Sequence, residues 1–128
     1  MLSIGIQHTL TLTVTQSETA KFVQSGGVEV LATPILINLV ERCAWQGVLP
    51  YMSQNTDTVG TYIEVKHLSP TPVGMTVRCF CELVAINDRE LVFNFEVFDD
   101  AEQIAQGIHK RFIIQCDKFQ NKADSKLK

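Results

Sequence analysis

Apolar residues recur at helical spacing in one long stretch of the chain, residues 30–50. At about 100° per residue the apolar positions fall on one side of a helix and the polar positions on the other. Thr33 is placed to cap this helix through its hydroxyl, Pro34 suits the first helical position, and Pro50 cannot continue the helix. The pattern predicts an amphipathic helix with the apolar face Leu36, Leu39, Val40, Cys43, Ala44 and Gly47.

Apolar and polar residues alternate with a period of two in most of the remaining chain, which is the pattern of half-buried strands. One such segment precedes the helix, and the break at Ser25-Gly26-Gly27 separates the two. Short polar turns join the last three segments, so we expect these to form an antiparallel meander. The predicted strands span residues 4–14, 58–68, 75–86, 91–98 and 103–116.

This order of elements predicts an α+β fold. One strand, one long helix and then a meander place a curved antiparallel β-sheet of about five strands around one long central helix. Such a sheet has exposed edges, and edge-to-edge pairing of two copies would cover them. We therefore expect a homodimer or a larger oligomer.

Length and composition narrow the class further. A chain of 128 residues forms one domain, and we expect residues 1–119 to form it and the polar residues 120–128 to be a flexible tail. The net charge of -3 and the absence of a long apolar run argue against nucleic-acid and membrane partners and favour a cytoplasmic protein. The four cysteines make no C-x-x-C pair, so we expect neither disulfides nor a metal site.

Three charged or titratable residues occupy positions where a pattern alone leaves their role open. Glu41 lies at the border of the two helix faces, where an ordinary solvated carboxylate is the commoner outcome. His67 ends the strand row that faces the helix, and a core-edge imidazole and a catalytic one are equally compatible with that place. Arg111 shares a strand face with His109, and a solvated residue or surface ion pair is the commoner fate of a strand arginine.

Four runs of sequence, in this order and spacing, resemble those of the hot-dog thioesterases related to fluoroacetyl-CoA thioesterase. The resemblance covers nearly the whole chain. It implies the hot-dog fold, dimers that share a continuous sheet, and acyl-CoA thioesters bound at the subunit interface. The runs are Val30–Pro34 with Glu41 following, Thr58–Thr61 leading to His67, Pro70–Met75, and Gly107–Phe112.

The resemblance also implies roles for individual residues. Thr33, Glu41 and His67 correspond to the catalytic group, with Glu41 as base or transient nucleophile and His67 as proton shuttle and orienting group. Gly60 corresponds to the glycine near the thioester carbonyl, and Arg111 to an arginine that orients the substrate or contacts CoA. The implied reaction is hydrolysis of a short or medium acyl-CoA to the free acid and CoA, with no cofactor beyond the CoA of the substrate. Thr33 is either a helix cap or a substrate contact.

One departure from the family concerns the acyl group. Fluoroacetyl-selective members carry aromatic residues just before an Ala-Thr motif, which is Ala32-Thr33 in this chain, and these aromatic residues form a hydrophobic lid. This chain has Gln24–Gly27 in the corresponding stretch. This difference argues against fluoroacetyl selectivity.

Two other functions share the fold: binding of acyl groups or small ligands without turnover, and hydration of enoyl-CoA, whose Asp-x-x-x-x-His spacing this chain lacks.

Overall fold

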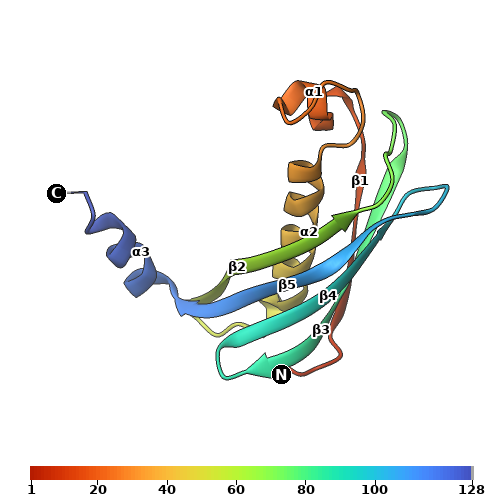
Figure 1. Cartoon of the computed structure of the whole chain (residues 1–128). Helices are drawn as coiled ribbons and strands as arrows, with labels where there is room; N and C mark the ends of the chain where they lie inside the picture. The colour runs from red at the N-terminus through yellow and green to blue at the C-terminus, as the bar shows by residue number, and fades with distance from the viewer. Residues whose placement is uncertain (128) are drawn as a thin grey trace.

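A computed structural model describes residues 1–127. Five strands form one sheet in the order β1-β3-β4-β5-β2, and every neighbouring pair is antiparallel. The sheet curls around the long helix α2 (Figure 1), as the sequence predicts. The strands are β1 (Gln7–Thr13), β2 (Thr56–His67), β3 (Thr76–Asn87), β4 (Glu90–Phe98) and β5 (Gln103–Gln115).

Helix α2 (Thr33–Val48) provides one half of the core. Its inner face is buried against side chains of the sheet, of which Phe93, Leu83 and Leu91 are among the largest fully buried ones. At Gly47 a Cβ atom would lie 2.9 Å from the Cβ of His8, so a glycine is needed where the helix meets β1. The buried residues of α2 confirm the predicted apolar face at Leu36, Leu39, Val40, Cys43 and Ala44, whereas Gly47 is only partly buried and Val48 is fully buried.

The start of α2 differs from the prediction, whereas its end agrees with it. Ala32 occupies the N-cap position without a side-chain hydrogen bond, and Thr33 is the first helical residue. Thr33 is therefore not the helix cap, because its hydroxyl is engaged by a distant residue described below. At the other end, α2 stops at Val48, before Pro50, as predicted; Pro50 lies in the short 3-10 helix η2 (Leu49–Tyr51), whose first turn does not use the N–H group that a proline lacks.

A β-bulge in β2 changes which residues face the helix. The register between β2 and β5 shifts between Gly60 and Tyr62, so one residue is left over on β2. Thr58 is consequently buried and Thr61 exposed, whereas strict alternation placed Thr61 on the inner face. Beyond the bulge the prediction is correct, and His67 ends the inward row. An alternating pattern does not reveal an extra residue of this kind, because the alternation resumes after it.

Two small helices precede α2, and one follows the sheet. The 3-10 helix η1 (Gln16–Glu18) carries the capping box between Thr15 and Glu18, and α1 (Ala20–Val23) follows it. The last helix, α3 (Cys116–Asp124), is exposed and extends away from the sheet (Figure 1). The sequence predicts that the domain ends at residue 119, but α3 continues to Asp124, so residues 120–124 are helical. Their flexibility stays a prediction, and Lys128 lies outside the described residues. None of the helices within residues 1–127 is both long and apolar enough to span a membrane.

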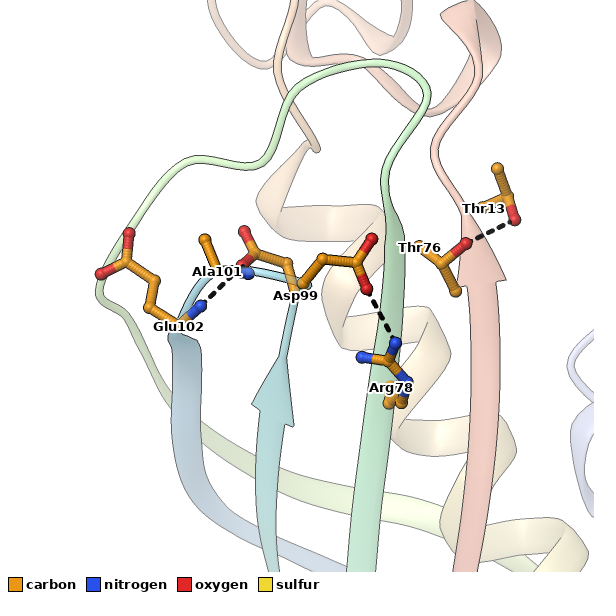
Figure 2. Close-up of polar contacts among 7 residues, drawn as sticks. Thr13, Thr76, Arg78, Asp99, Ala101 and Glu102 are labelled. Carbon is orange, nitrogen blue, oxygen red and sulfur yellow. Dashed lines mark hydrogen bonds and ion pairs between the residues drawn. The ribbon is translucent and has the colours of Figure 1, made fainter.

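The turn between β4 and β5 anchors the segment that leads into α2. Asp99 accepts hydrogen bonds from the backbone N–H groups of Ala101 and Glu102 at 2.8 and 2.9 Å (Figure 2). It also accepts one from the hydroxyl of Thr71 at 2.8 Å. The carbonyl of Thr71 in turn accepts the N–H of Leu31 at 2.9 Å. Asp99 therefore connects this turn, through the loop after His67, to the residues just before Thr33.

Replacing Asp99 with Ala is expected to lower the free energy of unfolding by about 1–3 kcal/mol, because three donors lose a buried acceptor. Burial raises the pKa of Asp99, but the hydrogen bonds from Ala101, Thr71 and Glu102 outweigh it, and the net pKa is lowered. A lowered folded-state pKa stabilises the protein above the unfolded value of about 3.9, and this contribution is lost as the pH falls through the folded value. Denaturant unfolding at a series of acidic pH values measures both effects.

The neighbouring Asp100 is the matched control for this prediction. It pairs with Arg78 at 2.7 Å, with both side chains substantially exposed, and such pairs contribute about 0–1 kcal/mol. Asp100→Ala should therefore change stability little. Equal destabilisation by the two substitutions would contradict the anchoring role of Asp99.

Candidate active site

The start of α2 and the end of β2 meet in a hydrogen bond between Thr33 and His67. The Thr33 Oγ1 atom lies 2.7 Å from Nδ1 of His67, although the residues are 34 positions apart. The other ring nitrogen, Nε2, is buried and has no hydrogen-bond partner among residues 1–127. Burial lowers the pKa of His67, with an opposing contribution from the backbone of Ser69. The imidazole is thus neutral near pH 7, with one nitrogen available to a ligand.

A cavity of about 380 Å³ lies beside this pair. Its walls are mostly apolar and come from the segment between α1 and α2 and from the loop after β2. Ser25 and Gly26 line it, so no aromatic side chain is present at the positions where the sequence departs from the fluoroacetyl-selective pattern. Other lining residues are Ala20, Val28, Leu31, Leu68 and Pro70.

A second group of polar side chains meets at Gly60, further along the helix. A Cβ atom on Gly60 would lie 2.5 Å from Oε2 of Glu41, 3.2 Å from Cε1 of His109 and 3.5 Å from Nη1 of Arg111. The bulge in β2 turns Gly60 toward these groups. A carboxylate, an imidazole and a guanidinium therefore converge on one point that only a glycine leaves open.

Arg111 is a buried residue of this group, not a solvated strand arginine. Its Nε donates to the Thr58 hydroxyl at 2.8 Å, and its Nη2 donates to the Thr58 carbonyl at 2.9 Å. Burial lowers the pKa of Arg111, while the charges of Glu41 and Asp57 oppose this change. Since an arginine stays charged in proteins, Arg111 places a fixed positive charge near the carboxylate of Glu41.

Replacing Gly60 with Ala is expected to lower thioesterase activity while leaving the fold intact. The added methyl group would lie 2.5 Å from the end of the Glu41 side chain, which can rotate away at little cost to stability but leaves its position beside Arg111. Displacing a reacting group by about 1 Å costs up to about 100-fold in rate. Steady-state kinetics and a thermal unfolding curve measure the two properties. Unchanged kcat/KM in Gly60→Ala would show that the position of Glu41 is unimportant.

The structure brings the five predicted site residues into two groups. Thr33 and His67 form one, and Glu41, Gly60 and Arg111 form the other. Glu41 follows Thr33 by eight residues, which is about 12 Å along a helix axis, and no hydrogen bond or ion pair links the two groups within residues 1–127 of one chain. Sequence reasoning noted His109 beside Arg111 but did not include it in the site, although the H-x-R spacing puts both on one strand face.

Comparison with solved structures defines the class of protein. A fluoroacetyl-CoA thioesterase superimposes with a TM-score of 0.93 at 27% identity over 98% of both chains. A hot-dog-like protein from Thermanaerovibrio acidaminovorans superimposes with a TM-score of 0.91 at 16% identity, over 99% of this chain and 94% of that one, which shows the fold alone. The chain is a hot-dog protein, as the sequence predicts.

Sequence comparison identifies the family within that class. The family described as fluoroacetyl-CoA-specific thioesterase matches residues 14–117. The fluoroacetyl-CoA thioesterase of Streptantibioticus cattleyicolor is 33% identical over 98 residues, covering 77% of this chain and 70% of that protein. The chain belongs to this thioesterase family, and the prediction of a thioester hydrolase acting on acyl-CoA is confirmed.

Proposed function

We propose that this protein hydrolyses short- or medium-chain acyl-CoA thioesters at a site built from Thr33, Glu41, Gly60, His67 and Arg111. The observation that carries the proposal is the buried, unpartnered Nε2 of His67 beside the 380 Å³ cavity. A buried nitrogen without a partner is costly, and a thioester carbonyl oxygen in the cavity would satisfy it.

The proposed chemistry follows from the groups present. In the proposed mechanism the Thr33 hydroxyl donates to Nδ1 of His67, so the neutral ring carries its hydrogen on Nε2 and donates a hydrogen bond from it to the thioester oxygen. Glu41 takes a proton from water as the water oxygen bonds to the thioester carbon. The C–S bond then breaks, and the departing thiolate of CoA receives that proton. Arg111 orients the thioester by its positive charge.

A homodimer explains how two separated groups form one site. Strand β2 lies at the end of the sheet order, so its outer edge is unpaired within one chain. Antiparallel pairing of two β2 strands places the end of one, at His67, beside the beginning of the other, near Gly60. In this arrangement each site takes Thr33 and His67 from one subunit and Glu41, Gly60 and Arg111 from the other.

Mixed dimers test this arrangement. His67→Ala and Glu41→Ala chains are each inactive as homodimers, but when co-expressed they form mixed dimers in which one of the two sites is intact. Because half of the dimers are mixed, up to about one quarter of wild-type activity should return. No recovery in mixed dimers of confirmed composition would place the whole site in one chain, and a monomeric mass at micromolar concentration would contradict the dimer.

The acyl group is set by the wall of the cavity. Ser25 and Gly26 present no bulky side chain there, so the proposed substrates extend beyond two carbons. Incubation with acyl-CoAs of increasing chain length, followed by detection of the free thiol, tests this directly. Selectivity for fluoroacetyl-CoA over longer chains would contradict the proposed acyl range, and ligand retention without thiol release would indicate a binding protein. We retain the cytoplasm as the proposed location.

A further inference from the structure

His109 is a fully buried histidine on β5, an inner strand of the sheet, with 1% of its surface exposed. It lies on β5 between β2 and β4, and its ring stacks on Phe93 with the ring centres 6.2 Å apart. The Nδ1 atom is 2.8 Å from the backbone carbonyl of Tyr62, and Nε2 is 3.2 Å from Nη1 of Arg111. Both ring nitrogens therefore have a partner inside the protein.

These two partners determine the tautomer of His109. A carbonyl oxygen only accepts hydrogen bonds, so Nδ1 carries the hydrogen. A guanidinium only donates, so Nε2 must present its lone pair to Arg111. Burial lowers the pKa of His109; the Tyr62 carbonyl and Glu41 oppose this shift, and Arg111 adds to it. The ring is consequently neutral, and it is a hydrogen-bond acceptor on the side of Arg111.

Three hydrogen bonds hold the guanidinium of Arg111. Its Nε and Nη2 atoms donate to Thr58, and its Nη1 donates to His109. Nη1 is also the guanidinium nitrogen that would lie 3.5 Å from a Cβ atom on Gly60, the same position that Oε2 of Glu41 approaches. Thr58 alone leaves the Nη1 end of the group without an anchor, because both of its contacts are on the opposite side.

We infer that His109 is a positioning residue, which acts through Arg111 to hold the guanidinium beside Gly60 for the bound thioester. The carbonyl of Tyr62 that orients His109 directly follows the bulge in β2. The bulge thus serves the site twice, by turning Gly60 inward and by presenting this carbonyl. The inference rests on the proposed function of Arg111 in thioester hydrolysis.

Three substitutions of His109 separate its two hydrogen bonds from its packing. His109→Gln places an amide oxygen near the position of Nε2 and keeps an acceptor for Arg111. His109→Asn places its amide near Nδ1, keeps the bond to Tyr62 and loses the acceptor. His109→Phe keeps the ring against Phe93 and loses both bonds. We expect kcat/KM of the Gln variant to stay within about threefold of wild type, and that of the other two to fall about 10- to 100-fold.

A double-mutant cycle shows whether His109 acts through Arg111. In an Arg111→Met background, His109→Asn should produce no further loss of kcat/KM. Thermal unfolding of every variant accompanies the kinetics. If the losses of kcat/KM follow the melting temperatures and the Gln and Asn variants are equally affected, His109 has only a structural role and the inference is overturned. A full additional loss in the Arg111→Met background would also overturn it.

A readout independent of activity distinguishes this inference from the proposed function. In the ¹⁵N NMR spectrum of the wild-type protein, Nδ1 of His109 should be protonated and Nε2 should not. An inactive wild-type protein that shows this tautomer would contradict the thioesterase proposal but leave the His109–Arg111 geometry standing. Protonation at Nε2 would overturn the inference whatever the activity.

Discussion

Replacing Glu41 with Gln is expected to lower kcat for acyl-CoA hydrolysis by about 10²- to 10⁴-fold, the usual contribution of a general base. The amide keeps the size of the side chain beside Gly60 but cannot take the proton of the attacking water. It also leaves the buried charge of Arg111 without the carboxylate that opposes its desolvation. Initial rates of CoA thiol release at saturating substrate measure the change.

Glu64→Gln is the matched control for Glu41→Gln. Glu64 lies on the same strand as Gly60 but is exposed, so its neutralisation should leave kcat nearly unchanged. An equally small effect of the two substitutions would remove Glu41 from the catalytic group. If Glu41 is instead a transient nucleophile, it forms a mixed anhydride with the acyl group, and single-turnover hydrolysis in H₂¹⁸O labels the Glu41 carboxylate when water attacks the glutamyl carbonyl. A general base is never labelled, so ¹⁸O in Glu41 would identify the nucleophile.

Replacing His67 with Ala is expected to lower kcat by about 10²- to 10³-fold, the cost of removing one oxyanion donor. The substitution removes the one buried side-chain nitrogen within residues 1–127 that has no hydrogen-bond partner, on a residue that lines the cavity. It also frees the Thr33 hydroxyl, whose hydrogen bond of 2.7 Å ends on this ring. Thr33→Val should have a smaller effect, because the ring then keeps Nε2 but loses the group that sets its tautomer.

His8→Gln is the control for His67→Ala. His8 lies on β1 and contacts Gln46 at 3.2 Å, outside both groups of site residues. Its replacement should leave hydrolysis nearly unchanged. A kcat of His67→Ala within a few fold of wild type, in a protein that folds normally, would show that the unpartnered Nε2 has no part in the reaction.

Family resemblance in four short runs predicted the hot-dog fold and the thioester chemistry, and both predictions are confirmed. Those runs contain the five residues proposed for the site. They did not include His109 in it: the spacing places His109 and Arg111 on one strand face, but the burial of both side chains cannot be read from a single alternating strand. The side-chain partner of His109 is Arg111 on the same strand, and the group that orients the ring is a main-chain carbonyl on another strand.

The stretch of residues 30–50 by itself determined the central helix, since an apolar stripe at helical spacing needs only local sequence. Period-two alternation likewise determined the strands. Only the tertiary structure decided what Thr33 does, because its hydroxyl could satisfy the helix end or a residue 34 positions away, and packing of β2 brought that residue within reach. The bulge at Gly60 and the burial of Arg111 were also decided in three dimensions. Both depend on how β2 and β5 pair, and pairing between distant strands is not written in the pattern of either one.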